Sequence, residues 1–450
     1  MKTLKRNLLV VVLFGGLLFV NTSCNDDDDT TQETPMMEKT ITQVAASDDN
    51  FSILVAALQK VGLDDDLAAD NSDFTVFAPT NAAFVALLEE LDVNGLDDIP
   101  NEVLTEVLLY HVVAGGKKAS MIESGYYSSL SSGPSEGYTL SFYVDMTMGK
   151  INDRASIIQT DIEADNGIIH VIDKVILPMS ITDHAVANKS FSSLVAAVTK
   201  AELAATLDND EGMFTVFAPV NDAFSMFLNE ANVSLDDLSK EALTPILLYH
   251  VMGSVVPASM VEAGYFPTLG SAFENNISVK VDVDNGVMLN SMSNVVASDV
   301  VATNGIIHAI DKVIVPPTIV DIASQNSNFS TLVSALVKAE LVDALLTEGP
   351  FTVFAPTNQA FEDLFAALEI TGLDDLTKED LTPILLAHVV SANALSTGLS
   401  NGNVPTLNTT KSIMVNVDNG VTIDGDVNVV AADVQGTNGI VHVIDKVIVP

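Results

Sequence analysis

The sequence is poor in cysteine, tryptophan and arginine, and each shortage excludes a class of structure or ligand. Cys24 is the only cysteine, so the chain cannot form an internal disulfide. Tryptophan is absent, which removes the flat indole platform that commonly stacks on sugars. Arginine occurs only at Arg6 and Arg154, and the formal net charge is −41. Because phosphate backbones are bound by clustered lysine and arginine, we exclude nucleic acid as a partner.

Catalytic signatures are missing as well. The sequence contains no Gly-x-Ser-x-Gly nucleophile elbow and no glycine-rich phosphate loop. Its histidines form no His-x-x-x-His or His-x-x-Glu pair of the kind that binds zinc. We therefore expect that the protein is not an enzyme and that it has no metal site and no cofactor.

The N-terminus has the features of an export signal. Basic residues precede the apolar segment Leu8–Val20, which is too short to span a membrane. The segment leads into Asn21-Thr22-Ser23-Cys24, where the lone cysteine resembles the lipid-modified cysteine of a bacterial lipobox. We predict a lipoprotein signal peptide over residues 1–23 and acylation of Cys24, which would attach the protein to a lipid membrane. The alternative is a secreted protein that is cleaved near Ser23.

An acidic segment follows Cys24. It contains the run Asp26–Asp29 and continues with polar residues, which predicts a flexible tether over residues 24–39. An acidic run at this place resembles the surface-export signals of some Gram-negative lineages. We therefore expect an outer membrane lipoprotein exposed on the cell surface. The alternatives are a plain solvated spacer for the acidic run and a lipoprotein that faces the periplasm.

Two sequence strings each occur three times, in one order and with one period. Phe-Thr-Val-Phe-Ala-Pro begins at Phe74, Phe214 and Phe351. Asn-Gly-Ile-[Ile/Val]-His-x-Ile-Asp-Lys-Val-Ile-x-Pro begins at Asn166, Asn304 and Asn438. The period is far longer than a solenoid repeat, so each copy is large enough to fold around its own core. We predict three tandem domains over residues 40–178, 179–317 and 318–450.

The first half of each copy predicts helices around one buried strand. Helical segments begin at Ile41, Ile181 and Ile319, and Phe-Thr-Val-Phe forms the strand. A second kind of helix follows an expected asparagine N-cap at Asn81, Asn221 and Asn358. A third starts with a threonine N-cap before Pro245 and Pro383, since proline fits the first helical position.

The second half of each copy predicts strands. In the second copy apolar and polar residues alternate from Ile277 to Asp284, and Asn285-Gly286 is a type I′ hairpin signal. Helices that precede an antiparallel sheet indicate an α+β domain and not a doubly wound fold.

These repeated strings, with a Tyr-His pair at the centre of each copy, resemble the signature elements of the fasciclin domain. The resemblance extends from residue 40 to residue 450, with departures at Val220 and Ala387. It implies a helical layer packed on an antiparallel β-wedge. It also implies adhesion, because animal members bind integrins, matrix proteins or glycans and microbial members are surface or secreted attachment proteins. The family has no established catalytic apparatus.

The histidines predict structural positions. Six of the seven recur in every copy, at His111, His250 and His388 and at His170, His308 and His442. Each lies inside an apolar run, which favours a buried imidazole that bonds to the backbone and joins helix to sheet. We expect His184, which has no histidine counterpart, to be partly buried.

Candidate ligand-binding residues come from the resemblance. Asp161-Ile162, Asp299-Val300 and Asp433-Val434 match the place where animal fasciclin domains carry an Asp-Ile pair linked to integrin binding, with Tyr110 and Tyr249 nearby. The alternative is an aspartate that bonds its own turn, followed by a buried aliphatic residue. Both interpretations remain open at this stage.

Acidic pairs leave one further alternative. Asp282 and Asp284, or Asp424 and Asp426, could bind calcium weakly, although no EF-hand loop is present. We predict a lipid-anchored adhesion protein that binds an extracellular protein or polysaccharide. A metal-dependent glycan-processing factor and a structural spacer of the envelope are the alternatives. The ligand and the oligomeric state stay open.

Overall fold

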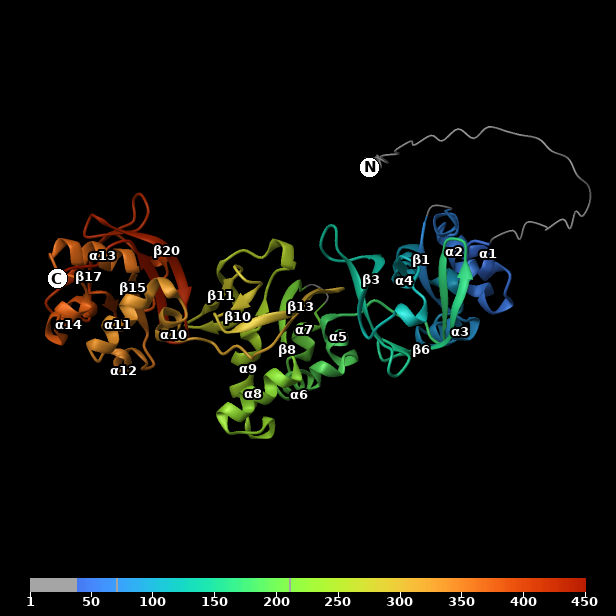
Figure 1. The fold of residues 1–450 in the computed structure, drawn as a ribbon, viewed down its shortest axis with the longest axis horizontal. Coiled ribbons are helices and arrows are strands. Elements are labelled where there is room, and N and C mark those ends of the chain that lie inside the picture. Colours follow the sequence, from blue (N-terminus) through green and yellow to red (C-terminus); the bar gives the residue numbers. More distant parts are fainter. Residues whose placement is uncertain (1–38, 70–71, 210–211) are drawn as a thin grey trace, which may run out of the picture. The chain divides into compact units, whose positions relative to one another are not determined.

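The computed structural model describes residues 39–69, 72–209 and 212–450, and residues 39–450 belong to one compact unit. The predicted signal peptide, Cys24 and all but the last residue of the predicted tether lie outside the described residues. Figure 1 colours the chain by sequence, so the three copies follow one another from blue through green and yellow to red.

The first copy contains four α-helices and seven strands. The helices are α1 (Ile41–Ala46), α2 (Ser52–Val61), α3 (Asn81–Glu90) and α4 (Asn101–Tyr110), and the strands are β1 (Phe74–Pro79), β2 (Val112–Ala114), β3 (Gly125–Ser132), β4 (Thr139–Asp145), β5 (Lys150–Ile151), β6 (Ala155–Ala164) and β7 (Gly167–Ile172).

The second copy repeats this order with one additional short helix. Its helices are α5 (Ile181–Ala187), α6 (Ser192–Lys200), α7 (Ala204–Leu207), α8 (Asn221–Ala231) and α9 (Lys240–Tyr249), and its strands are β8 (Phe214–Pro219), β9 (Val251–Met252), β10 (Gly264–Ala272), β11 (Asn275–Asp282), β12 (Met288–Leu289), β13 (Ser293–Ala302) and β14 (Gly305–Ile310).

The third copy has the same elements as the second. Its helices are α10 (Ile319–Ser324), α11 (Ser330–Lys338), α12 (Val342–Leu345), α13 (Asn358–Ala367) and α14 (Lys378–Ala387), and its strands are β15 (Phe351–Pro356), β16 (Val389–Val390), β17 (Gly402–Pro405), β18 (Ser412–Asn416), β19 (Thr422–Ile423), β20 (Val427–Gln435) and β21 (Gly439–Ile444).

Each copy builds a seven-stranded sheet, in the order β2-β1-β7-β6-β5-β4-β3 for the first copy. The predicted α+β class is confirmed, but the sheet is mixed and not purely antiparallel. Strand β1 pairs in parallel with β7, from Phe74 opposite Gly167 to Pro79 opposite Ile172. All elements from α3 to β6 lie in the connection between these two strands, which is the long crossover that a parallel pair requires. The two repeated sequence strings are therefore neighbouring strands at the centre of the sheet.

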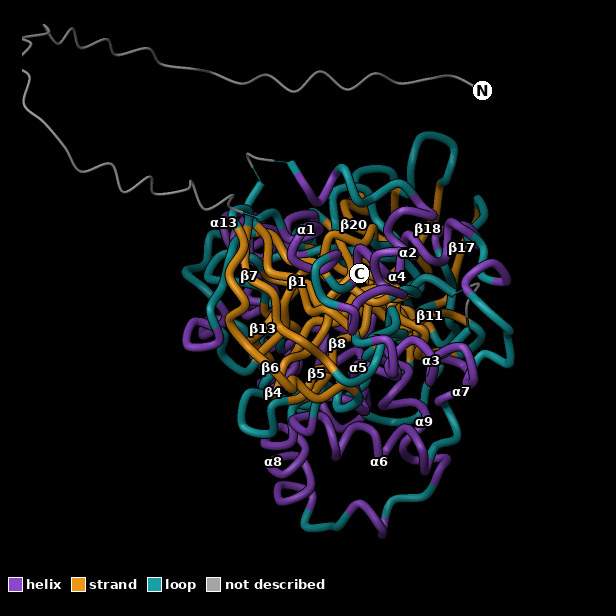
Figure 2. Tube along the Cα trace, turned by 90° about the vertical axis from the view of Figure 1, so that its right-hand side faces the viewer, coloured by secondary structure: helices purple, strands orange, loops and turns teal. Residues whose placement is uncertain are grey.

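The helices cover one end of each sheet. In both views α6 and α8 lie on the same side of β8 (Figures 1 and 2). Helix α2 shows why these segments pack there, because it buries Leu54, Ala57 and Leu58 at helical spacing. Gly62 ends this helix in the left-handed region at φ 74°, which glycine adopts without strain.

Each copy has two hydrophobic cores. In the first copy one core joins the helices to β1 and β7 and includes Phe84, Leu104 and Ile169. The other core fills the far end of the sheet around Tyr110 and Phe142. The central strands contribute to both cores, which is why they are buried on both faces.

The asparagine N-caps that the sequence predicts are wrong. Thr80 and Thr357 cap α3 and α13 through their hydroxyls, while Val220 precedes α8 without a side-chain cap. Asn81 is the first helical residue, and its carboxamide accepts the Ile53 N–H at 2.9 Å and donates to Asp49 O at 2.8 Å. The asparagine therefore ties the start of α3 to the start of α2, a contact between segments that no local helix rule contains.

Two further local predictions need correction. Helices α9 and α14 begin at Lys240 and Lys378, with Ser239 and Thr377 as N-caps, so Pro245 and Pro383 lie inside the helices and not at their first position. The hairpin at Asn285-Gly286 exists, but the paired residues are Val281 with Leu289 and Asp282 with Met288, which leaves a wider loop than a two-residue turn.

Successive copies contact each other through the same pair of faces. The Val301 N–H donates to Ser141 Oγ at 3.0 Å between the first two copies. At the same position between the second and third copies, the Gln435 N–H donates to Ser278 Oγ at 3.2 Å. Two equivalent tyrosines add a second contact, since Asn188 donates to the Tyr126 hydroxyl at 3.3 Å and Asn326 donates to the Tyr265 hydroxyl at 3.1 Å. We call these two contact regions the first joint and the second joint.

Over the described part of the chain, no helix combines the length and apolarity needed to cross a membrane.

Candidate functional site

One histidine of each copy joins the end of a helix to the segment after the last strand. His111 Nδ1 contacts Val107 O at 2.6 Å, and the Ile176 N–H donates to its Nε2 at 3.0 Å. The equivalent contacts of His250 run to Ile246 and Ile314, and those of His388 run to Ile384 and Ile448. Both ring nitrogens are thus used by the neutral imidazole, and burial lowers the pKa of all three histidines to about 4.

The other repeated histidine lies in the last strand and holds the candidate aspartate in place. The Asp161 N–H donates to His170 Nδ1 at 3.3 Å, and His170 Nε2 contacts Lys117 O at 2.9 Å. His308 and His442 make the same contacts in the other copies, and burial lowers their pKa values. Neither ring nitrogen of these three histidines is available to a ligand.

Each candidate aspartate sits at a bulge and caps a neighbouring turn. Asp161, Asp299 and Asp433 have φ values of 61°, 59° and 66°, in the left-handed region. Their Oδ1 atoms accept the N–H groups of Ala119, Ala258 and Ser396 at 2.7, 2.8 and 2.7 Å. Asp161 is exposed, whereas Asp299 and Asp433 are half-buried. In the third copy Ser396 Oγ also bonds Asp433 Oδ2, so that carboxylate is bonded through both oxygens.

The aliphatic partners of these aspartates differ in accessibility. Val300 and Val434 are each 3% exposed and belong to the cores of their own copies. Ile162 is half-buried and packs at the edge of its core. Moreover, the residues after Val300 and Val434 form the joints, whereas among the described residues no preceding copy lies against the edge at Asp161 and Ile162. Val300 and Val434 are therefore core residues and not surface contacts.

Tyr110 and Tyr249 also lie in the core. Both are 0% exposed. The Tyr110 hydroxyl donates to Ser141 O at 2.6 Å, and the Tyr249 hydroxyl donates to Ser278 O at 3.0 Å. Burial raises the pKa of both phenols. A surface ligand cannot reach side chains that are completely enclosed, so we assign both tyrosines to packing and not to ligand contact.

His184 is fully buried, and the expectation of partial burial is wrong. It lies at the first joint, where its ring centroid is 5.6 Å from that of Tyr126 in the preceding copy. Within the described residues neither ring nitrogen makes a hydrogen bond of normal geometry, and the backbone of Val301 is the polar group that acts on the ring, since it opposes the lowering of the pKa. Burial lowers the pKa of His184 to about 3. Val44 and Ile322 occupy the equivalent position in the other copies, so only the first joint contains a titratable group here.

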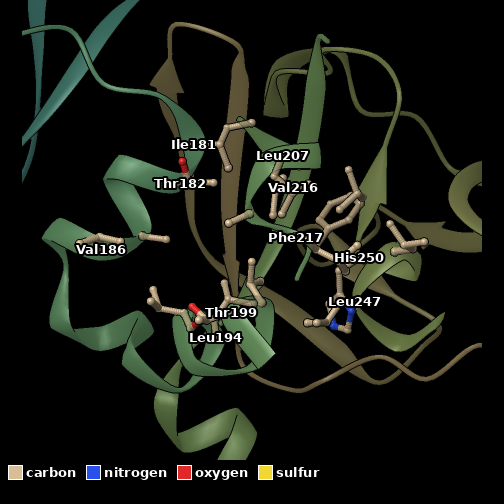
Figure 3. A pocket seen from close by; sticks show the side chains of 17 residues that line it. Ile181, Thr182, Val186, Leu194, Thr199, Leu207, Val216, Phe217, Leu247 and His250 are labelled. Atoms are coloured by element: carbon tan, nitrogen blue, oxygen red, sulfur yellow. The ribbon is translucent and has the colours of Figure 1, made fainter. Parts of the chain in front are cut away.

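Two cavities of different kinds lie in the second copy. The smaller has a volume of about 100 Å³ and lies between α5, α6, α7 and β8. Figure 3 shows its apolar lining, with Ile181 and Val186 on one helix and Leu194 on the next. This volume is below that of typical small-molecule sites, so we interpret it as a packing void. The larger cavity has a volume of about 600 Å³ and lies beside β10.

A metal centre has no counterpart among the described residues, where no group of three or more histidine, cysteine, aspartate or glutamate side chains is arranged to hold an ion. Asp282, one of the calcium candidates, forms a salt bridge with Lys280 at 2.6 Å. Asp424 and Asp426 likewise pair with Lys411 and Lys446, at 2.9 and 3.1 Å.

Comparison with known families explains the threefold repetition. The sequence profile of the fasciclin domain matches residues 49–178, 189–316 and 327–450. The chain belongs to the fasciclin family. Each fasciclin domain begins with the helix bundle that covers β1, β8 or β15 and ends with the strand that carries the second histidine.

Relatives with several fasciclin domains match most of this chain. Transforming growth factor-beta-induced protein ig-h3 of Sus scrofa is 32% identical over 422 residues, which is 91% of this chain and 57% of that protein. Human periostin is 28% identical over 431 residues, which is 92% of this chain and 49% of periostin. The chain thus spans about half the length of these relatives.

Bacterial and insect proteins are similar over shorter stretches. Protein sll1483 of Synechocystis is 43% identical over 133 residues, which is 30% of this chain and 73% of that protein. A solved pair of fasciclin domains from the insect cell adhesion molecule Fasciclin I matches with a TM-score of 0.39 and 20% identity, over 58% of this chain and 97% of that chain.

Proposed function

We propose that this protein is a lipid-anchored adhesion protein that binds an extracellular protein or polysaccharide through its fasciclin domains. The observation that carries the proposal is the presence of three fasciclin domains with one uncovered Asp-Ile edge, at Asp161 and Ile162. The proposal includes acylation of Cys24, an outer membrane location with the domains outside the cell, and no catalytic activity.

The exposed edge of the first domain is the ligand contact that the geometry favours. Asp161 Oδ1 is held by the Ala119 N–H at 2.7 Å, so the carboxylate is fixed in position while the side chain stays exposed. Glu163 lies two residues further along the same edge and pairs with Lys118 at 2.6 Å. A rigid, charged edge of this kind suits a polar ligand that supplies hydrogen-bond donors. In the second and third domains the equivalent edges continue into Val301 and Gln435, which take part in the two joints.

Replacing the charge at this edge is expected to weaken attachment. Asp161→Asn keeps the carbonyl oxygen that accepts the Ala119 N–H but removes the negative charge. We expect about a tenfold loss of binding to immobilised matrix proteins or polysaccharides, because a charge-assisted hydrogen bond becomes a neutral one. Binding of the full chain to an array of these ligands, measured by surface plasmon resonance, provides the readout.

Asp433→Asn is the matched control for this prediction. The Asp433 carboxylate is bonded through both oxygens to Ser396 and is half-buried, so the proposal expects its substitution to leave attachment unchanged. Equal losses in the two variants, or unchanged binding by Asp161→Asn, would show that the contact surface lies elsewhere.

Anchoring is tested separately from adhesion. Cys24→Ala removes the only thiol that can take a lipid, and we expect the protein to move from the membrane fraction to the soluble fraction. Fractionation followed by a carbonate wash and immunoblotting measures this change. If the variant stays with the membrane after the wash, the anchor is a different part of the chain.

A further inference from the structure

The larger cavity of the second domain has the size of a small-molecule site. Its volume is about 600 Å³, within the range of about 300–1,000 Å³ that is common for ligand pockets. It lies between the segment 253–262, which follows β9, and the strands β10 and β11. Its walls are mainly apolar and include Met252, Val256, Met260, Phe266 and Val281. Methionine side chains adapt to ligands of different shape, which suits a binding wall.

In the first domain, two aromatic side chains occupy the position that corresponds to this cavity. Tyr127 and Phe142 are cross-strand partners in β3 and β4, and their rings stack with centroids 6.1 Å apart. The Tyr127 hydroxyl donates to Glu123 O and accepts the Glu123 N–H, both at 3.0 Å. These two bonds tie the segment before β3 to the sheet. The Phe142 ring also meets Phe77 edge-on, with centroids 5.5 Å apart.

The second domain changes both members of this pair. Phe266 and Val279 are the cross-strand partners at the same register of β10 and β11. Phe266 has no hydroxyl, so it cannot tie down the segment that contains Glu262. Val279 is too small to fill the place that the Phe142 ring takes between Phe77 and Tyr127. Phe217 and Phe266, the counterparts of Phe77 and Tyr127, both line the cavity. Of these two substituted residues, Phe266 lines the open space directly, and Val279 is its fully buried cross-strand partner.

Most polar atoms in the wall of the cavity already form hydrogen bonds within the protein. Thr215 donates to Ser254 O at 2.7 Å and accepts the Val256 N–H at 2.8 Å. Thr268 donates to Ile277 O at 2.8 Å. Glu262 is the only charged residue of the lining; it is exposed and forms no salt bridge with any described residue. The wall thus combines a long apolar surface with one free carboxylate at its rim.

We propose that this cavity binds an amphiphile, with its apolar part against Phe217, Met252 and Phe266 and a cationic head group beside Glu262. A cationic head is favoured over an anionic one because the carboxylate is unpaired and the whole chain carries a net charge of −41. Burial of the apolar part provides most of the binding free energy. This site lies in the second domain and is independent of the edge at Asp161.

The test uses the full chain and three defined probes. Nile red, a neutral apolar dye, reports occupation of the cavity by its fluorescence, and dodecylamine and dodecanoate compete with it below their micelle-forming concentrations. We expect saturable dye binding at one site and displacement by dodecylamine at about tenfold lower concentration than by dodecanoate. Glu262→Gln should remove this preference for the amine while it leaves dye binding intact.

The paired substitution F266Y/V279F copies the first domain into the second and provides the decisive control. Because Tyr127 and Phe142 already pack in the same fold, we expect the variant to fold with an unchanged melting temperature and to lose at least about tenfold in dye affinity. The reciprocal variant Y127F/F142V should open a second site in the first domain and raise the stoichiometry from one dye to two. Unchanged dye binding by a folded F266Y/V279F chain, or equal displacement by amine and carboxylate, would overturn the proposal.

Discussion

Lowering the pH from 7 to 4 is expected to unfold the second fasciclin domain before the other two. Each domain buries one histidine at the end of a helix whose pKa falls from 6.5 to about 4, namely His111, His250 and His388. The second domain buries His184 in addition, with a pKa lowered to about 3. The second domain thus buries three histidines with lowered pKa values, His184, His250 and His308, whereas the third domain buries two such histidines and the first domain buries one.

The direction of this effect follows from proton linkage. A depressed pKa means that the folded state holds the neutral imidazole, so the contribution to stability is complete above pH 6.5 and is lost as the pH falls toward the folded pKa. Each pH unit between the two pKa values changes the free energy of unfolding by about 1.4 kcal/mol. A histidine with a folded-state pKa near 4 therefore lowers the free energy of unfolding by on the order of 3 kcal/mol between pH 6.5 and pH 4. The second domain loses about twice that amount, which is a large part of the stability of a typical domain.

His184→Ile is the matched variant for this prediction, because Ile322 occupies the same position at the second joint. We expect it to bring the acid unfolding of the second domain into line with that of the third. Hydrogen exchange detected by mass spectrometry along a pH series separates the three domains. The explanation fails if the variant and the natural chain lose protection in the second domain at the same pH.

Removing the buried tyrosine of the second domain is expected to have the largest effect on stability at neutral pH. Tyr249 is completely buried, its hydroxyl donates to Ser278 O at 3.0 Å, and the Asn290 amide donates to it at 3.0 Å. Tyr249→Ala leaves a ring-sized cavity and two unpaired polar groups, so we expect a loss of about 3–5 kcal/mol. Equilibrium denaturation followed by domain-resolved hydrogen exchange measures the change.

Two milder variants separate the ring from the hydroxyl. Tyr249→Phe keeps the ring and is expected to cost about 1–3 kcal/mol, since only the hydrogen bonds are lost. Tyr265→Phe removes a hydroxyl that bonds Asn326 across the second joint at 3.1 Å, and we expect a cost of about 1 kcal/mol or less. If Tyr249→Phe lowers the free energy of unfolding as much as Tyr249→Ala does, the hydrogen bonds of the hydroxyl, and not the packing of the ring, account for the contribution of Tyr249.

Local sequence rules predicted the elements of this fold better than their contacts. The α+β class followed from the change of hydrophobic period between the two halves of each copy. The parallel pairing of β1 with β7 did not, because it joins strands that are separated in the sequence by two helices and five other strands. Asn81 was predicted to cap its own helix, whereas its carboxamide bonds Ile53 and Asp49 on another segment. Rules about neighbours along the chain contain no information on such partners.

Local sequence rules predicted the residues of the candidate site only in part. The apolar neighbours of His170 in the sequence indicated that it is buried, and the structure places it at 0% exposure. The tyrosine of the Tyr-His pair was taken as a possible surface contact, although Tyr110 lies at the end of an apolar helix face and is enclosed by β4. The cavity beside Phe266 was missed, because its signal is a difference between copies at two positions, Phe266 and Val279, that only the strand register brings together.

The two joints have a further consequence for how copies of this protein meet. Each joint pairs a face on β3 and β4, or on β10 and β11, with a different face of the next domain, so the interface is heterologous. Heterologous contacts build open fibres when both faces are free on one molecule.

The faces of the first and third domains that form no joint among the described residues do not match in this way. The first domain presents Asp48 and Glu163 where the later domains use asparagine and an uncharged residue, and the third domain presents Asn403 where the others use tyrosine. Met414, 47% exposed, replaces Tyr143 and Lys280 on the same face. This mismatch opposes a joint between the first domain of one molecule and the third domain of another.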